Sequence, residues 1–382
     1  DGMPVNMRSH AHGQGYTDLG FLIPELVQRI EYKKGPYFAG EGDFSSAGSA
    51  RMRLADSLPN GTVSLSLGEN GYRRMVVTDS VAEGEDKMVY GLEVHRNRGP
   101  WETPEDLRKY SATLRYVHGA GNVGFSVTAM AYRNTWNATD QVPLRAVEGG
   151  QLDRFAGIDA SDGGVTSRYS LSWALRKRAA GSLTEVNAYA VASSLDLYSN
   201  FTYFLDNPDV GDQFAQGERR QMAGLNAAHS WTGSVNGLAV RNKLGLQARA
   251  DRLAPVGLYR SVMRERSATV REDRVKESSA GVYFENTIAW LPALRSVAGL
   301  RYDAYRFDVD SSIEGNTGKA SRGIASPKLS LVFGPWSKTE LFVNYGKGFH
   351  SNDARGTTQT RLVDGSAASP VTPLVATRGM EA

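Results

Sequence analysis

The sequence predicts an all-β protein of the membrane-barrel type. Most of the chain alternates apolar and polar residues with a period of two, the alternating runs are long, and the connections between runs alternate between short and long. The 382 residues could hold one large β domain, and 41 glycines with 17 tyrosines and 13 phenylalanines favour strands and turns over helices. A large soluble β protein is the alternative interpretation.

The composition excludes several classes of protein. The absence of cysteine removes disulfides, cysteine zinc sites and thiol catalysis. The net charge of +3 comes from 44 basic and 41 acidic residues without a basic tract, so nucleic acid is not an expected partner. No apolar run reaches the length of a transmembrane helix, and residues 1–6 do not read as a signal peptide.

The alternation is clearest in residues 167–177, where Tyr169, Leu171 and Trp173 share one face and serines and arginines share the other. Residues 110–116, 240–249 and 341–345 repeat the pattern. The polar face carries too much charge for the core of a sandwich, so we expect the apolar face to contact lipid.

Thirteen runs of this kind are predicted to be strands, most of about 8–14 residues. A strand that crosses a bilayer needs about 9–11 residues, whereas strands of soluble proteins average about 5–6. The predicted strands are residues 62–68, 72–81, 87–96, 109–118, 122–133, 167–177, 183–193, 220–231, 237–250, 278–290, 296–308, 326–333 and 338–346.

Short turns at one rim and long loops at the other are typical of an outer-membrane barrel. The predicted short links are 82–86, 119–121, 178–182, 232–236, 291–295 and 334–337, and the predicted long loops are 134–166, 194–219, 251–277, 309–325 and 347–376. Trp173, Trp231 and Trp290 lie near strand ends and are candidates for the interfacial aromatic girdle, with ordinary packing as the alternative.

An odd number of strands does not close a barrel of the bacterial kind, and residues 379–382 look like the start of a fourteenth strand. An open sheet edge in lipid would leave unpaired backbone groups. We therefore expect this chain to be part of a longer protein.

Residues 1–54 lack sustained alternation and carry a set of motifs instead. "DGMPVN", followed by "IPELVQRIEYKKGP", resembles the plug domain of TonB-dependent outer-membrane receptors, with matches at Pro24, Val27, Arg29, Ile30, Glu31, Gly35 and Pro36. "GLRYD" at 299–303 and "NYGKGFHSNDARG" at 344–356 resemble segments of the family's barrel, although His350 and Asn352 depart from the pattern. Residues 39–52 also depart from it.

The resemblance implies a fold and a location. The fold would be an all-β membrane barrel of 22 strands filled by a small α+β plug domain. This chain would hold only the C-terminal part of the plug, residues 1–54, and the N-terminal part of the barrel, residues 55–382. The protein would be a monomer in the outer membrane of a Gram-negative bacterium, surrounded by lipid and lipopolysaccharide, and would need no cofactor.

In such plugs the loop between the Asp-Gly-Val-Pro strand and the Ile-Pro helix faces outward and touches the ligand. Residues 7–18 would be this loop, and its ligand-binding candidates are His10, His12, Gln14 and Tyr16. Glycines 13 and 15 would expose backbone donors. The histidines with Met3 and Met7 form a weak copper-binding pattern, and solvated loop histidines are the plainer interpretation.

The long loops supply further ligand-binding candidates, namely Tyr198, Phe201, Tyr203, His350, Asp353 and Arg355. Aromatic residues in a loop predict folding over a ligand, or loop–loop packing. Loop 251–277 is mixed in sign and is expected to be solvated or to contact lipopolysaccharide.

Arg29 and Glu31 lie two residues apart and would point to one face of a strand. The resemblance implies that they pair with charged residues of the barrel's inner wall as a plug–barrel lock. Glu285, Arg301 and Asp303 are the wall candidates. Pairing of Arg29 with Glu31 is the alternative.

No recognised catalytic or phosphate-binding motif is present, so we do not expect an enzyme. The implied function is active uptake of a scarce nutrient, driven by the TonB–ExbB–ExbD complex. A ferric siderophore is the first candidate ligand, and cobalamin, copper and an oligosaccharide are alternatives. A passive porin-like channel and a lipid hydrolase with a serine and one of His95, His118, His229 or His350 are the competing hypotheses.

Overall fold

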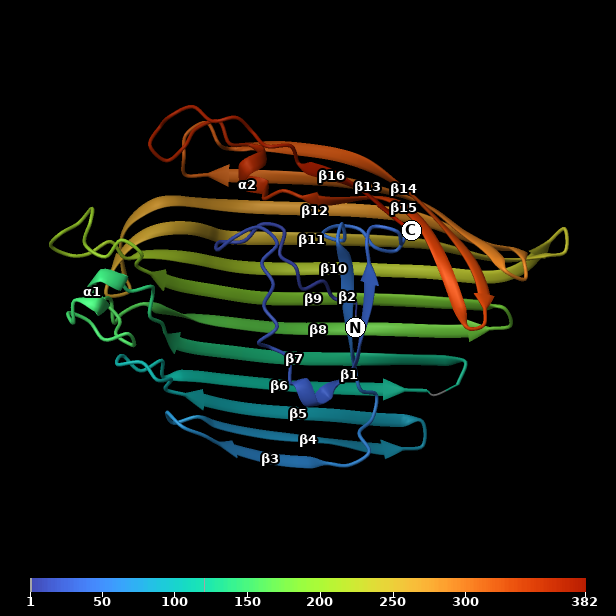
Figure 1. Cartoon of the computed structure of the whole chain (residues 1–382), viewed down its shortest axis with the longest axis horizontal. Coiled ribbons are helices and arrows are strands. Elements are labelled where there is room, and N and C mark those ends of the chain that lie inside the picture. The colour runs from blue at the N-terminus through green and yellow to red at the C-terminus, as the bar shows by residue number, and fades with distance from the viewer. Residues whose placement is uncertain (1, 120) are drawn as a thin grey trace.

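The chain folds into one large antiparallel sheet with a small N-terminal segment against one face of it (Figure 1). The computed structural model describes residues 2–119 and 121–382. Within these residues the sheet has 14 strands in chain order, each paired with the next. They are β3 (Thr62–Leu67), β4 (Arg73–Glu83), β5 (Asp86–Asn97), β6 (Leu107–His118), β7 (Val123–Asn137), β8 (Gly163–Ala179), β9 (Ser182–Ser199), β10 (Phe214–Val235), β11 (Leu238–Val262), β12 (Glu265–Leu291), β13 (Leu294–Ser311), β14 (Gly318–Trp336), β15 (Thr339–Ser351) and β16 (Leu374–Glu381).

The N-terminal segment, residues 2–54, contains the 3₁₀ turn η1 (Pro24–Leu26) and a two-stranded antiparallel sheet of β1 (Val27–Lys34) and β2 (Gly48–Leu54). In Figure 1 these two strands run across the strands of the large sheet. Residues 2–6 are outside any strand, and the helix expected at Ile-Pro is this single 3₁₀ turn. In the described part of the chain, no helix has the length and apolar character needed to span a membrane.

Period-two alternation decides which side chains of the large sheet face the N-terminal segment. On β13, Arg301 and Asp303 are buried on that inner face, whereas Leu300 and Tyr302 are exposed by 57% and 52% on the outer face. The outer face therefore carries the large apolar side chains that the sequence assigned to lipid. Trp173, Trp231 and Trp290, the girdle candidates, are all partly exposed.

The connections fall at two rims of the sheet. Two-residue turns at 84–85, 180–181, 236–237, 292–293 and 337–338 lie at one rim, on the right of Figure 1 where they can be seen. The longest connections, 138–162, 200–213 and 352–373, lie at the other rim together with the short helices α1 (Leu144–Glu148) and α2 (Ala354–Thr357). This alternation agrees with the predicted barrel topology.

The prediction that residues 251–277 form a loop was wrong. β11 and β12 continue through it to a two-residue turn at Met263 and Arg264, whose φ angles of 52° and 69° are typical of a type I′ hairpin. The strands continue beyond the apolar band with charged and polar residues on both faces, so the apolar signal ends before the pairing does. Parts of 194–219, 309–325 and 347–376 are strand for the same reason.

All the strands predicted for the large sheet occur. Each of the thirteen predicted strands corresponds to one strand of the large sheet, and the fourteenth, β16, begins at Leu374 instead of residue 379. The sequence interpretation placed Arg29 and Glu31 on a strand, which is β1, but it did not predict β2 or the separate sheet that the two strands form.

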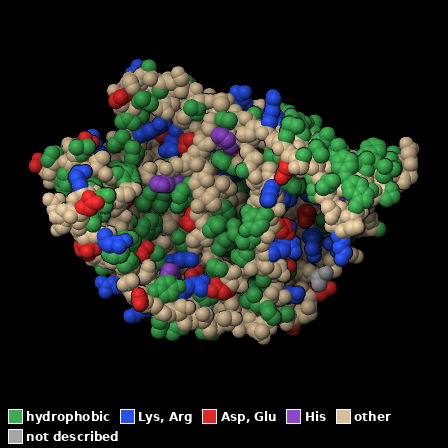
Figure 2. Space-filling view, in the orientation of Figure 1, with side chains coloured by type: hydrophobic (Ala, Val, Ile, Leu, Met, Phe, Trp, Pro, Cys, Tyr) green, Lys and Arg blue, Asp and Glu red, His purple; other side chains and the backbone are tan. Residues whose placement is uncertain are grey.

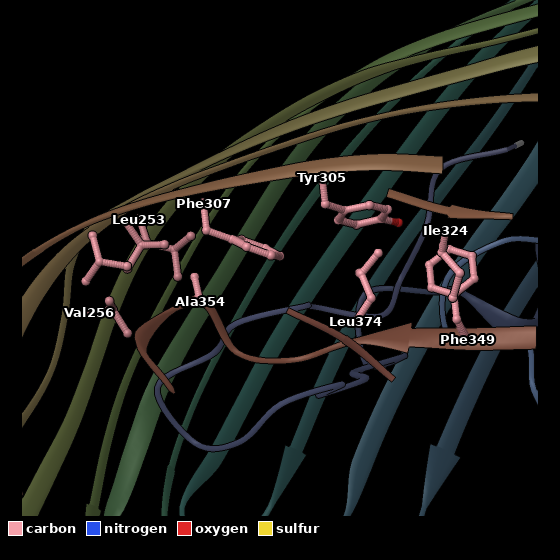
Figure 3. Close-up of a cluster of buried hydrophobic side chains, with 10 residues drawn as sticks. Leu253, Val256, Tyr305, Phe307, Ile324, Phe349, Ala354 and Leu374 are labelled. Atoms are coloured by element: carbon pink, nitrogen blue, oxygen red, sulfur yellow. The ribbon is translucent and has the colours of Figure 1, made fainter. Parts of the chain in front are cut away.

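Two apolar clusters join the connecting segments to the inner face. Phe21, Ile23 and Leu26 of the N-terminal segment pack with Val76 and Val89 of the sheet. The second cluster lies nearer the rim of long connections (Figure 3), where Ala354 and Leu374 point towards Tyr305, Phe307 and their neighbours on the curved sheet. The inner face is thus packed against protein at both places.

Glycines on β15 and β16 make room for Pro36. A Cβ placed on Gly346 would lie 2.3 Å from the Pro36 carbonyl oxygen, and one on Gly379 would lie 2.8 Å from the proline ring. The Lys328 ammonium donates a hydrogen bond of 2.6 Å to the same carbonyl. The Gly35-Pro36 motif therefore fits a groove that only glycine leaves open.

We predict that Gly346→Ala loosens the N-terminal segment, because its Cβ collides with backbone that has no room to move. Limited proteolysis in membranes should cleave residues 2–54 of this variant several-fold faster than the wild type. Gly233→Ala is the control, since nothing lies within 4 Å of its Cβ. Equal cleavage of the two variants would contradict the packing described for Pro36.

Candidate functional site

The predicted apical loop, residues 7–18, is anchored to the inner face of the sheet. Two backbone hydrogen bonds close the loop, from Met7 to Tyr16 (2.9 Å) and from Gly15 to Met7 (2.7 Å). Arg8, Ser9 and His10 are almost completely buried, at 5%, 0% and 5% exposure. The loop is therefore docked at its base and is not the freely solvated loop that its composition suggests.

Arg8 and Ser9 join the loop to β12, β13 and α2. The Arg8 guanidinium donates to Asp43 (2.9 Å) and to the Ser279 hydroxyl (2.8 Å), and it lies 4.7 Å from the centre of the Tyr305 ring. The Ser9 hydroxyl donates to the buried Glu277 carboxylate and accepts from the Ala354 amide. Burial lowers the pKa of Arg8, but the acidic groups around it raise the pKa above its ordinary value, so Arg8 is charged.

The wall presents its own charges to this loop. Arg220 is fully buried, donates to Glu218 and Asp251 at 2.8 Å each, and also donates to the Ser9 carbonyl oxygen. Arg249 pairs with Asp251 and donates to the Asn6 carbonyl oxygen at 3.0 Å. Buried charges that have such partners are held in place, and removing one partner leaves the other uncompensated.

His10 is held as a neutral imidazole. Its ring stacks on Tyr16 with centroids 4.0 Å apart, and its Nδ1 accepts from the His12 amide at 3.1 Å. Its Nε2 lies 3.9 Å from a Glu218 oxygen. Burial, only partly opposed by Glu218, lowers the pKa of His10 to about 4. At neutral pH the contact with Glu218 is therefore not an ion pair.

The tip of the loop remains accessible. His12, Gly13 and Gln14 are exposed, and the His12 ring shares a 2.9 Å hydrogen bond with Gln216. The Gln14 amide lies 3.1 Å from Nδ1 of His350 and donates to the Ser351 carbonyl oxygen at 3.0 Å. The structure thus brings His12, Gln14 and His350 to one accessible region.

Asp353 and Arg355 support this region from α2. Arg355 pairs with both Asp353 oxygens, at 2.9 and 2.7 Å, and donates to the His10 carbonyl oxygen at 2.8 Å. Burial raises the pKa of Asp353, but Arg355 more than offsets this, and the pKa lies below its ordinary value. The charges of Asp353 and Arg355 hold the loop in place, so the role of these two side chains is structural.

The three aromatic candidates lie elsewhere. Tyr198 is in β9, 5.8 Å from the guanidinium of Arg264, and Phe201 is exposed beside Phe214. Tyr203 has a positive φ of 62° and its carbonyl oxygen accepts from Asp212. Among the residues described, no recorded contact links these three to the tip of the apical loop.

The predicted lock is not formed as expected. Arg29 pairs with Glu31 at 2.7 Å, and Glu31 also pairs with Arg53, so both stay on the small sheet, with Arg29 exposed and Glu31 half-buried. Glu285 lies opposite Lys243 in the large sheet. Arg301 and Asp303 do lie on the inner wall, but they pair with each other. The alternative interpretation, local pairing of Arg29 with Glu31, describes the structure.

Sequence reasoning missed the residues that fix the N-terminal segment. Arg8, Glu218, Arg220, Asp251 and Glu277 carry that contact. A signal was available, because the four wall residues occupy the buried face of strands whose other face is exposed. Charges at such positions need partners from a packed neighbour.

Neither metal binding nor hydrolysis gains support from the described residues. Within them no group of three or more histidines and carboxylates is placed to hold a metal ion. His118 pairs with Asp86 and His229 with Thr184, and neither ring meets a serine hydroxyl in the recorded contacts.

The large sheet is a meander with an apolar outer face, short turns at one rim and long connections at the other, and it has a segment bound to its inner face. These features define an outer-membrane β-barrel receptor. The family model of the TonB-dependent receptor-like β-barrel matches residues 97–378. The chain belongs to the TonB-dependent receptors, a family of outer-membrane β-barrel receptors of Gram-negative bacteria.

Solved structures share the fold at low sequence identity. The unliganded ferric citrate transporter FecA matches with a TM-score of 0.78 and 12% identity, over 93% of this chain and 54% of that one. The siderophore receptor PiuA of Acinetobacter baumannii matches with 0.72 and 12%, over 90% and 56%. The copper transporter OprC matches with 0.71 and 14%, over 93% and 56%.

This chain therefore spans about half the length of the receptors that it matches. No curated protein sequence matches it.

We predict that acid weakens the docking of the apical loop through His10. The unfolded loop gains a proton below a pKa of about 6.5, while the folded loop stays neutral down to about 4, so protection falls as pH drops through this window. At about pH 5.5 the free energy that keeps the loop docked falls by about 1 kcal/mol. The protection of the amides of residues 7–16 against hydrogen exchange measures this fall.

His10→Gln should flatten this pH dependence, and His12→Gln, at an exposed position of the same loop, should keep it. An unchanged pH profile in His10→Gln would contradict the burial of a neutral imidazole.

Proposed function

We propose that the chain is part of a receptor for TonB-dependent active uptake of a scarce nutrient, with a ferric siderophore as the first candidate. Residues 1–54 would be the C-terminal part of the plug domain and residues 55–382 the N-terminal part of the barrel. Energy would come from the TonB–ExbB–ExbD complex. The protein would act as a monomer, without catalytic activity.

The observation that carries this proposal is the place of the apical loop. Its partners Gln216, Glu218 and Ser351 lie near strand ends beside the long connections, and Asp353 lies within connection 352–373. In this class of barrel the long connections face the outside. The exposed tip therefore points to the side from which a nutrient arrives. A segment fastened to the inner wall at this depth obstructs a passive channel.

The residues divide into two roles. His12, Gln14 and His350 offer imidazole nitrogens and a side-chain amide at the accessible tip, so we propose that they contact the ligand. His10, Asp353 and Arg355 hold the loop from below. The exposed Phe201 in connection 200–213 would add apolar contact from a loop that closes over the ligand.

The names of structures that share the fold suggest the ligand class. Structures that share the fold are named for ferric citrate, siderophores, ferric catecholates and copper. Donors without a fixed charge suit a ligand that brings its own coordinated metal, because the receptor then needs hydrogen bonds and not metal ligands.

We predict that Gln14→Ala with His350→Ala raises the half-saturating concentration for uptake by about thirtyfold, since two polar contacts of about 1 kcal/mol each are lost. Uptake of radioactive iron as citrate, catecholate and hydroxamate complexes, and of cobalamin, measures it in cells with and without TonB. Glu314→Ala, at an exposed loop position, is the control and should change nothing.

TonB loss should abolish uptake by the wild-type receptor. Uptake that persists without TonB would replace the transporter proposal with a passive channel. Uptake of cobalamin alone would keep active transport and overturn the siderophore assignment.

A further inference from the structure

A small cavity of about 40 Å³ lies between the apical loop and the inner wall, and it is called here the loop–wall cavity. The loop borders it on one side, and strands β8, β9 and β10 border it on the other. Figure 2 shows the face of the sheet that carries the N-terminal segment, where acidic and basic side chains are grouped among apolar ones. A cavity of this volume has room for one small ion or for about two or three water molecules.

Arg168 of β8 borders the cavity as a buried cation without a partner. It is 6% exposed, and its Nε and Nη2 nitrogens are enclosed without a hydrogen bond. Its guanidinium lies 4.5 Å from the centre of the Phe21 ring, a contact that uses the flat face of the group and leaves the N–H groups in its plane free. In the described part of the wall, Arg220 and Arg249 have carboxylate oxygens at 2.8 and 2.7 Å, whereas no ion pair includes Arg168. A buried charge of this kind requires a partner of opposite sign.

Ser193 of β9 adds a hydroxyl donor to the same cavity. It is the cross-strand partner of Arg168, so alternation places both side chains on the inner face. Within the described residues, the Ser193 hydroxyl makes no hydrogen bond. Met7 of the loop and Leu195 of β9 add apolar surface around the two polar groups. Apolar surroundings keep water away and strengthen the attraction of the guanidinium for an anion.

The two carboxylates that border the cavity are engaged elsewhere. Glu218 accepts a hydrogen bond of 2.8 Å from Arg220, which balances its charge. Asp18 is half-buried and accepts from the Gly20 amide at 2.7 Å. Nε and Nη2 of a guanidinium form its side-on fork, with two N–H groups that point in one direction. The fork of Arg168 is therefore left for a group that enters the cavity.

We propose that the loop–wall cavity binds one small monovalent anion, with chloride as the ion that fits its size. The anion would lie in the fork of Arg168 and accept a further hydrogen bond from the Ser193 hydroxyl. Because loop and wall enclose the cavity together, the anion would bind only while the loop is docked and would hold it there. This site goes beyond the proposed uptake function, since the residues of the accessible tip do not border the cavity and a siderophore does not fit into about 40 Å³.

Bromide tests the site directly, because it replaces chloride at a similar radius and scatters X-rays anomalously. Crystals of the receptor grown in sodium bromide should show an anomalous peak within hydrogen-bond distance of Nε and Nη2 of Arg168 and of the Ser193 hydroxyl. A water molecule at this position, or the Asp18 carboxylate, with no bromide signal would overturn the proposal.

Hydrogen exchange of residues 7–16 at neutral pH tests the effect on the loop, with sodium chloride compared with sodium gluconate at equal ionic strength. Gluconate is too large for the cavity. At a chloride concentration of about ten times the dissociation constant, amide protection should rise by about tenfold. Equal protection in the two salts would contradict the anion site.

Ser193→Ala is a mild variant that should weaken chloride binding by about fivefold, because one hydrogen bond of about 1 kcal/mol is lost. Ser194→Ala is its control and should keep the wild-type dissociation constant. The Ser194 side chain is on the outer face, where its hydroxyl lies 2.7 Å from that of Ser167. The same dissociation constant in both serine variants would remove Ser193 from the site and overturn the geometry proposed for it.

Arg168→Gln should abolish the difference between chloride and gluconate. Arg133→Gln, which removes an exposed cation from the neighbouring strand β7, is the charge-matched control and should keep that difference. Asp18→Asn should also keep it, since a nearby negative charge is removed while the side chain still accepts from Gly20. Loss of loop protection in both salts in Asp18→Asn would instead make Asp18 the partner of Arg168 and overturn the anion site.

Discussion

The buried contact of Arg8 and Ser9 with the charged wall is the interaction on which the rest of the structure depends. Glu277 and Arg220 are enclosed in protein, where an unpartnered charge is costly, and Ser9 provides a hydroxyl to one and a carbonyl to the other. Removal of one partner from such a buried set costs about 3–5 kcal/mol. This contact sets the depth of the apical loop, and with it the position of His12 and Gln14 at the outer rim.

The same strands serve two environments because their side chains alternate. Arg301 and Asp303 face the N-terminal segment, while Leu300 and Tyr302 between them face outward. A strand can therefore hold a charged inner wall and an apolar lipid surface without conflict. Towards the rim of long connections the outer face also becomes charged, which lets β11 and β12 extend as a hairpin above the apolar band.

Much of the fold could be predicted from the sequence, because period-two alternation is a local property. The thirteen predicted strands all occur in order. Strand ends such as 251–277 could not be predicted, since pairing continues where the apolar signal stops. For the candidate site, motifs on either side of residues 7–18 indicated the apical loop, and the structure places Gln14 of this loop beside His350. The motifs failed for Arg29 and Glu31. The packing of the folded chain decides whether a charged residue pairs with a neighbour on its own strand or with a residue about 200 positions away, and the sequence of one strand does not carry this information.

In the proposed TonB-dependent uptake, the N-terminal segment would move relative to the wall. The chain has no cysteine, and a Cβ on Gly299 would lie 2.9 Å from the Cβ of Ala39, so Ala39→Cys/Gly299→Cys needs a shift of only about 1 Å to reach disulfide geometry. TonB-dependent uptake should stop when this pair is oxidised and return on reduction, and the reduced double variant, which has the same crowding at Gly299, is the control. Equal uptake by the oxidised and reduced receptor would contradict the account.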